Sequence, residues 1–168
     1  MTQTVPQGNA ASGYTVAILT VSDGVSRGER EDQSGATIQA MLPVHAQVVD
    51  RRVVPDERPA IEAVLREWSG RGIDFVVTTG GTGLGPRDVT PEATRAVLDR
   101  EVAGMAEAMR AAGLAKTPLA MLSRAVVGAR GRTLIVNLPG SPKGVREGLE
   151  VILPVVEHAI HMMHGGGH

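Results

Sequence analysis

The sequence Thr78-Thr79-Gly80-Gly81-Thr82-Gly83-Leu84-Gly85-Pro86-Arg87-Asp88 joins a predicted strand to a predicted helix. The strand is the apolar, β-favouring run 73–77 that comes directly before it. The helix is predicted to begin at Thr90-Pro91-Glu92, with Thr90 as N-cap, a proline at the first helical position and an acid in the first turn. The order is therefore strand, glycine-rich loop and helix.

This glycine-rich loop has the composition of a phosphate site. Its four glycines permit positive φ angles and allow a ligand to approach main-chain N–H groups. Such groups, near the positive end of a helix, suit an anion. Arg87 adds a cation, and Asp88 adds a carboxylate that would repel phosphate unless a divalent metal lies between them. We therefore interpret the loop as a phosphate and Mg²⁺ site.

A plainer interpretation is that the loop only turns the chain. The loop has Pro86 where the third glycine of a GxGxxG fingerprint would stand, and it lacks the GK[ST] ending of a P-loop. The threonines, arginine and aspartate that accompany the glycines favour the functional interpretation.

Outward from the loop, β-favouring runs alternate with amphipathic segments. This alternation predicts a three-layer α/β sandwich, with a mostly parallel sheet, one antiparallel hairpin strand and helices on both faces. We expect a disordered leader over residues 1–13, a single domain over 14–164 and a loose tail over 165–168. Besides 73–77, the predicted strands are 14–21, 46–54, 122–129 and 133–138. The predicted helices begin at Ser34, at Pro55-Asp56-Glu57, at Thr90 with a break at Gly104, and at the loop 139–144.

Composition excludes several classes of function. The 168 residues carry a formal net charge of −1 and one Trp, one Tyr and one Phe, so nothing favours nucleic acid as a partner. No cysteine is present, which excludes thiolate chemistry and disulfides. The amino terminus lacks the features of a signal peptide, and no apolar stretch is long enough to span a bilayer. We therefore expect a cytoplasmic protein with no membrane partner.

Four predicted loops carry polar side chains and follow predicted strands. In open α/β sheets, ligands bind beyond the carboxyl ends of the strands, so we expect these loops to form one site. Each residue also has a structural alternative. Asp56 could be the N-cap of a helix at Glu57, and Asp88 could be a turn former. Arg87 and Lys143 could be solvated surface charges. The predicted site residues are Ser22, Asp23, Asp56, Gly80 to Asp88, and Pro139 to Lys143, with Ser22 and Asp23 as turn formers in the alternative.

Several motifs together resemble one known family. Thr78–Gly83 followed by Arg87–Glu92, together with Asn137–Lys143, resembles the MoaB/MogA family of molybdenum cofactor biosynthesis. The resemblance runs from about Tyr14 to His164. Its further motifs are Thr20-Val21-Ser22-Asp23, Asp32-Gln33-Ser34-Gly35, Val54-Pro55-Asp56-Glu57 and Leu122-Ser123-Arg124.

The resemblance implies a molybdopterin adenylyltransferase, which transfers AMP from Mg-ATP to the terminal phosphate of molybdopterin and releases pyrophosphate. It implies Mg²⁺ as cofactor, ATP and molybdopterin as substrates, a homo-oligomer that is a trimer in most members, and a molybdenum-insertion enzyme as partner. Asp56 and Asp88 correspond to the family's catalytic, metal-holding carboxylates. The residues that correspond to the pterin and nucleotide pocket are Gly80, Gly81, Thr82, Gly83, Pro139, Gly140, Ser141, Pro142 and Lys143, and we add Ser22, Asp23 and Arg87.

Two other functions fit parts of the sequence. A non-catalytic molybdopterin carrier would need the glycine loops but not Asp56 and Asp88. An unrelated nucleotide-binding switch is disfavoured because the chain has no P-loop lysine. His158, His161 and His164 have a spacing that could bind a transition metal, but partly exposed imidazoles at a helix end are the favoured interpretation.

Overall fold

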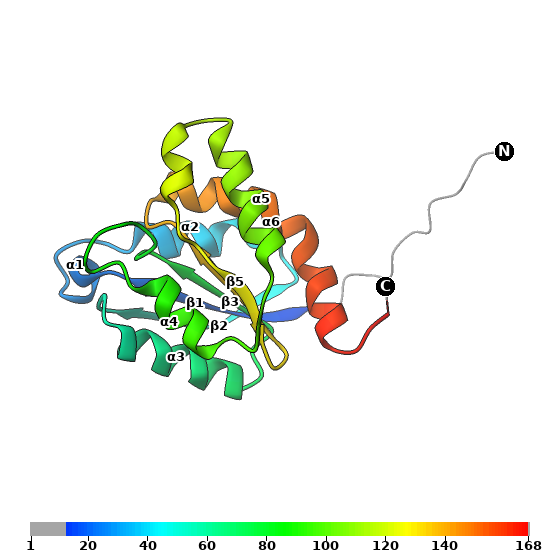
Figure 1. Cartoon of the computed structure of the whole chain (residues 1–168). Helices are drawn as coiled ribbons and strands as arrows, with labels where there is room; N and C mark the ends of the chain where they lie inside the picture. The colour runs from blue at the N-terminus through cyan, green and yellow to red at the C-terminus, as the bar shows by residue number, and fades with distance from the viewer. Residues whose placement is uncertain (1–12, 168) are drawn as a thin grey trace.

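The computed structural model describes residues 13–167. The predicted leader therefore lies outside the described residues except for Gly13, as does His168 of the predicted tail. Figure 1 shows a twisted sheet between two layers of helices, which is the predicted three-layer α/β sandwich. None of the helices in the described part is both long and apolar enough to cross a bilayer.

The sheet has six strands in the order β2-β1-β3-β6-β5-β4. Strands β2, β1, β3 and β6 are parallel, whereas β5 runs antiparallel to both β6 and β4. The predicted hairpin is confirmed, and the short strand β4 was not predicted. The strands are β1 (Tyr14–Val21), β2 (Ala46–Val54), β3 (Phe75–Thr79), β4 (Arg100–Glu101), β5 (Val127–Arg130) and β6 (Thr133–Leu138).

Helices cover both faces of this sheet (Figure 1). Helices α3 and α4 pack on one face, and α2, α5 and α6 pack on the other. The helices are α1 (Asp23–Ser26), α2 (Gln33–Met41), α3 (Arg58–Gly70), α4 (Thr90–Val97), α5 (Ala103–Leu114), the 3-10 helix η1 (Pro118–Leu122) and α6 (Pro142–Met163).

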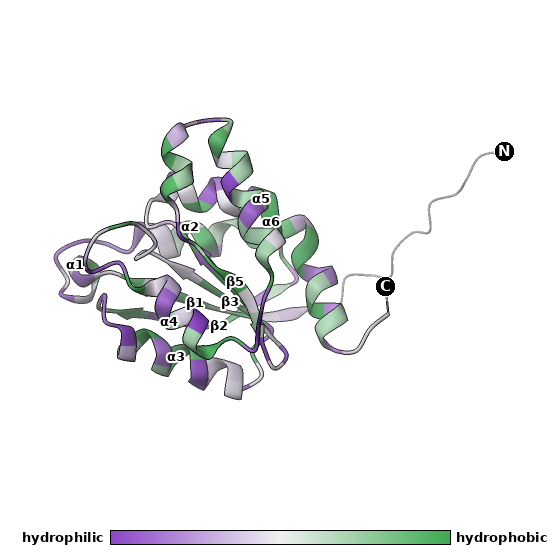
Figure 2. Cartoon of the chain, in the orientation of Figure 1, coloured by the Kyte–Doolittle hydropathy of each residue, from purple (hydrophilic) through white to green (hydrophobic). Residues whose placement is uncertain are grey.

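Each face of the sheet has its own apolar core because side chains alternate along a strand. On β3, Phe75 and Val77 face α6, whereas Val76 packs with α3. The predicted apolar stripe of α3 is confirmed, because its four members are all buried. They are Ile61, Val64, Leu65 and Trp68. Figure 2 shows hydrophilic residues on the outward side of α3 and hydrophobic residues in the central strands.

The structure corrects two predicted boundaries in the elements beside β5. The strand predicted from Leu122 begins only at Val127: Leu122 ends η1, and the carbonyl oxygens of Ser123 and Ala125 accept from the Arg110 guanidinium. The helix break predicted at Gly104 occurs earlier, over 98–102, where Asp99 and Val102 donate main-chain N–H groups to β5.

Candidate active site at the carboxyl ends of the parallel strands

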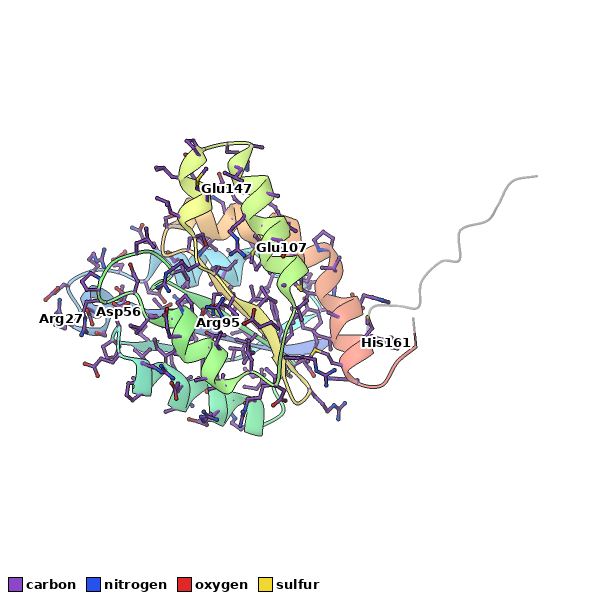
Figure 3. The ribbon with its side chains drawn as sticks, in the orientation of Figure 1. Arg27, Asp56, Arg95, Glu107, Glu147 and His161 are labelled. Carbon is purple, nitrogen blue, oxygen red and sulfur yellow. The ribbon has the colours of Figure 1, made fainter. Side chains whose placement is uncertain are left out.

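The four loops that carry the predicted site residues meet at one edge of the sheet. Val21 pairs with Val54, Thr20 pairs with Thr79, and Thr79 pairs with Leu138, so the four parallel strands end level with one another. The loops that follow therefore emerge together. Figure 3 places Asp56 at this end of the molecule, near α1, and places His161 at the opposite end.

Asp23 and Asp56 hold each other through reciprocal hydrogen bonds. The N–H group of Asp23 donates to Oδ2 of Asp56 at 2.8 Å, and the N–H group of Asp56 donates to Oδ1 of Asp23 at 3.0 Å. The Arg87 guanidinium then binds both carboxylate oxygens of Asp23, at 3.0 and 2.8 Å. These bonds from Arg87, with the N–H of Asp56, lower the pKa of Asp23 to about 2.

Asp56 lies in the opposite electrostatic situation. Burial raises its pKa, and the neighbouring charges of Asp23 and Asp88 raise it further. Its Oδ1 has no hydrogen-bond donor among residues 13–167. The interpretation of Asp56 as an N-cap is wrong: α3 begins at Arg58, and the capping position is Glu57, whose side chain makes no capping bond.

Asp88 folds back over the glycine-rich loop. Its Oδ2 accepts the N–H of Gly85 at 2.8 Å, so the turn-forming role considered for it is present. A Cβ atom at Gly83 or Gly85 would lie 2.9 or 2.8 Å from that oxygen, so a side chain at either position would require the Asp88 carboxylate to shift. Because Asp88 also raises the pKa of Asp56, the two carboxylates lie within electrostatic reach of each other. Oδ1 of Asp88 has no donor among the described residues.

The carbonyl groups of residues 80–83 in the glycine-rich loop all accept hydrogen bonds from Thr90 or Arg124. Thr90 donates to the first two, through its hydroxyl and its N–H group, and Arg124 donates to the next two, through its N–H group and its Nε. The four acceptors are the carbonyl oxygens of Gly80 (2.9 Å), Gly81 (3.1 Å), Thr82 (3.0 Å) and Gly83 (2.8 Å).

This arrangement turns the N–H groups of the loop outward. In a trans peptide unit the C=O and N–H bonds point in opposite directions, and no cis peptide bond is present in the described part. The N–H groups of residues 81–84 therefore point away from Thr90 and Arg124, and none donates to another residue of 13–167. Consecutive N–H groups without an acceptor among the described residues suit an anion.

Glycine is required at position 80, directly before the N–H groups of residues 81–84, which we call the cradle. Its φ is +99°, and a Cβ atom would overlap the carbonyl oxygen of Val21 at the end of β1. The prediction of Thr90 as N-cap is wrong: the capping position of α4 is Val89. Thr90 is instead fully buried, and its hydroxyl donates to the Gly80 carbonyl.

The second loop, 139–143, is held against the first. The Thr79 hydroxyl donates to the Pro139 carbonyl, and the Ser34 hydroxyl donates to the Gly140 carbonyl, each at 2.7 Å. Ser141 caps α6 by accepting the N–H of Gly144. Ser34 is therefore not the N-cap of α2 as predicted; Asp32 is the cap, accepting the N–H of Gly35 at 2.9 Å.

Two pockets border both loops. The first, of about 440 Å³, lies on the α1–α2 side, and the second, of about 400 Å³, lies between α5, η1 and the start of α6. Asp23, Asp56, Arg87 and Asp88 line neither pocket. Of the predicted site residues, Ser22, Gly80, Gly140 and Pro142 line the first pocket, and Thr82, Gly83, Pro139, Ser141 and Lys143 line the second.

The predicted Mg²⁺ ligands fit that ion. Mg²⁺ in phosphate-transfer sites binds to one or two carboxylates and completes its shell with water and phosphate oxygens. Asp56 and Asp88 each have one oxygen without a donor in the described part, and the burial of Asp56 leaves its charge poorly compensated. No group of three or more His, Cys, Asp or Glu side chains within 13–167 could hold a metal by itself. Binding by these aspartates would therefore be shared with the phosphates.

The carboxyl-terminal histidines lie far from this site. His164 ends α6 and lies 3.0 Å from Asp74, whose other carboxylate oxygen accepts from Thr15. His45 pairs with Glu157 of the same helix at 3.3 Å.

Thr90 and Arg124 orient the loop that carries the N–H groups of residues 81–84, but sequence reasoning assigned Thr90 to a helix N-cap and gave Arg124 no role. Arg124 belongs to the quoted motif Leu122-Ser123-Arg124, so the motif was visible although its function was not. Asp32 was also missed; besides capping α2, it accepts from the Thr20 hydroxyl and from Arg51. Its signal was its position directly before Gln33-Ser34-Gly35.

Comparison with known proteins places the chain in one family. The family model described as "Probable molybdopterin binding domain" matches residues 17–158. The molybdopterin adenylyltransferase of Helicobacter pylori strain J99 is 40% identical over 154 residues, covering 89% of this chain and 88% of that protein. Gephyrin of Dictyostelium discoideum is 40% identical over 168 residues. The match covers 94% of this chain but only 23% of gephyrin's length.

Solved structures agree with the sequence relatives. The crystal structure of the molybdopterin biosynthesis enzyme MoaB from Thermus thermophilus has a TM-score of 0.86 and 57% identity, covering 90% of this chain and 97% of that one. The family model covers more than half of the chain, and the fold and glycine-rich loop are those that the motifs predicted. The chain therefore belongs to the family of molybdopterin-binding domains of molybdenum cofactor biosynthesis.

Proposed function

We propose that this protein transfers AMP from Mg-ATP to the terminal phosphate of molybdopterin and releases pyrophosphate. The observation that carries the proposal is the outward N–H cradle of residues 81–84, with Asp56 and Asp88 beside it. The name of the Helicobacter pylori relative, molybdopterin adenylyltransferase, supports the same reaction.

The two pockets match a reaction that joins two substrates. The first borders the glycine-rich loop at Gly80 and the second borders it at Thr82 and Gly83, and both border the 139–143 loop, so ligands bound in them would contact neighbouring parts of the same two loops. Helix α6, which is 22 residues long, begins at Pro142, which lines the first pocket, so its positive end would favour a phosphate placed there.

The chemistry needs charge neutralisation and alignment more than it needs a base. A phosphate oxygen of molybdopterin attacks the α-phosphorus of ATP, a new P–O bond forms, and the bond to the bridging oxygen breaks to release pyrophosphate. The attacking phosphate is already ionised at neutral pH. Two anions must therefore be held in line, which is the task of the N–H cradle and of Lys143.

Asp56 and Asp88 would hold Mg²⁺ through the oxygens that have no donor in the described part of the chain. The ion, when bound, supplies positive charge that neutralises the phosphates and orients them. Arg87 could add charge stabilisation through Nη1 while its Nε and Nη2 groups stay bound to the Asp23 carboxylate.

A reaction mixture of the purified protein, molybdopterin and Mg-ATP tests this proposal. We expect pyrophosphate release that requires both molybdopterin and Mg²⁺. Tight molybdopterin binding without release would instead identify a carrier, and ATP hydrolysis without molybdopterin would identify a nucleotide switch. Either of these results would contradict the proposal.

We also propose that the protein is a cytoplasmic homo-oligomer. The resemblance to the MoaB/MogA family implies a trimer. Leu119, Met121 and Leu122 of η1 are exposed apolar side chains, which support a subunit contact there.

A further inference from the structure

Arg124 binds three main-chain carbonyl groups of the glycine-rich loop. Its N–H donates to the Thr82 carbonyl, its Nε donates to the Gly83 carbonyl at 2.8 Å, and its Nη2 donates to the Asp88 carbonyl at 2.7 Å. One residue therefore binds both ends of the segment 82–88.

Glu92 fixes the plane of this guanidinium. Its Oε1 accepts from Nη1 of Arg124, and this bond lowers the pKa of Glu92. Oε2 of Glu92 is buried and has no partner among the described residues. Because the guanidinium is planar and its donors are rigidly arranged, holding Nη1 also fixes the directions of Nε and Nη2.

The two loop carbonyls bound by Nε and Nη2 control different parts of the site. The Gly83 carbonyl shares a peptide unit with the N–H of Leu84, so its bond to Arg124 turns that N–H outward. The bond from Nη2 to the Asp88 carbonyl anchors the main chain of Asp88, whose carboxylate accepts the N–H of Gly85. Both the anion cradle and the carboxylate therefore depend on Arg124.

We propose that Arg124 is a positioning residue that, braced by Glu92, sets the direction of the Leu84 N–H and the orientation of the Asp88 carboxylate. It does not need to touch substrate for this role. The proposal rests on the proposed adenylyl transfer for its kinetic consequences, but its structural consequence for the loop does not.

The segment 82–88 gives a readout that is independent of activity. The N–H of Gly85 donates to the Asp88 carboxylate, and the N–H of Asp88 donates to the Gly85 carbonyl at 3.0 Å. Loss of the Arg124 anchor should open this turn, so we expect faster amide hydrogen exchange in a peptide spanning 82–88 of the Arg124→Ala variant.

Arg130→Ala is the matched control. Arg130 also donates from Nη1 to a carbonyl, that of Val97 at 2.8 Å, but at the other end of α4. Exchange over 82–88 should stay as in the wild-type protein. Arg124→Lys is a second test variant, since it keeps a cation but cannot form the fork and protects against the case that the alanine variant does not fold.

The kinetic expectation is a loss in kcat with little change in the KM for molybdopterin. Removal of a residue that orients a metal ligand costs about 10–100-fold, so we expect kcat to fall by that factor in both Arg124 variants. The Mg²⁺ concentration needed for half-maximal rate should rise, because the main chain that carries the Asp88 carboxylate is no longer anchored by Arg124. Added guanidinium should restore part of the rate in Arg124→Ala and none in Arg124→Lys.

Exchange over 82–88 that matches the Arg130→Ala control would overturn the positioning role, whatever the rates. Faster exchange with a kcat equal to that control would overturn its link to catalysis. If the wild-type protein shows no AMP transfer, the proposed function fails, and the exchange measurement still decides whether Arg124 holds the loop.

Discussion

Asp23 and Asp56 each donate a main-chain N–H to the other's carboxylate, at 2.8 and 3.0 Å. This exchange ties the end of β1 to the end of β2 and brings two negative charges together. Arg87 compensates only Asp23, whose pKa falls to about 2, whereas burial raises the pKa of Asp56. The uncompensated partner is therefore the one suited to a divalent cation.

Asp56→Asn should make the protein more stable at neutral pH while abolishing AMP transfer. A raised folded-state pKa means that ionising Asp56 costs folding free energy, a cost that is present above that pKa and absent below the ordinary aspartate pKa of about 3.9. Asparagine keeps an oxygen for the Asp23 N–H. We expect a higher Tm than wild type at pH about 7 and a difference that shrinks below pH about 4. A lower Tm at neutral pH would contradict this assignment.

Arg87→Gln should show the opposite pH dependence. The lowered pKa of Asp23 stabilises the fold above the ordinary aspartate pKa, and this stabilisation is lost as the pH falls toward about 2. Urea unfolding should find the variant less stable than wild type at neutral pH, with the two converging in acid. A difference that stays constant with pH would show that the ion pair is not its source.

Gly80→Ala should destabilise the protein more than Gly131→Ala. Both glycines have positive φ, +99° and +56°. A Cβ at Gly131 meets nothing within 4 Å, so that variant should cost only the backbone penalty, about 1–2 kcal/mol. A Cβ at Gly80 also overlaps the Val21 carbonyl oxygen, which adds a clash to that penalty. Equal unfolding free energies for the two variants would contradict the close approach of the loop to β1.

Thr90→Val and Thr133→Val form a second matched pair. Both threonines are fully buried and donate a hydroxyl to a carbonyl, Thr90 to Gly80 at 2.9 Å and Thr133 to Ile73 at 2.6 Å. Each variant should lose about 1–3 kcal/mol of stability because a buried carbonyl loses its donor. Only Thr90→Val should also raise the KM for ATP, because only its carbonyl belongs to the anion cradle. A raised KM in both variants would indicate a general effect of stability.

The main features of the fold were predictable from local pattern. The run 73–77 is apolar and bounded by glycine-rich sequence, and α3 carries its apolar residues at helical spacing, so both elements could be predicted from neighbours in the chain. The four loops could be placed together because each follows a predicted strand.

The helix caps and the role of Arg124 were not predictable in the same way. Thr90 and Ser34 have the composition of N-caps, but their hydroxyls bind Gly80 and Gly140, and Gly140 lies 106 residues from Ser34. Arg124 acts on a loop far earlier in the chain, since Gly83 lies 41 residues before it. Contacts of this range depend on the assembled sheet and leave no local periodicity in the sequence.

The most direct test of the central claim is molybdopterin-dependent pyrophosphate release by the Asp88→Asn variant, measured beside the wild-type protein. Because we propose that Asp88 holds the metal, and because asparagine keeps the same shape, we expect the variant to fold and to bind molybdopterin. We expect release to fall by about 100-fold or more. Release at the wild-type rate would contradict the assignment of Asp88 to adenylyl transfer.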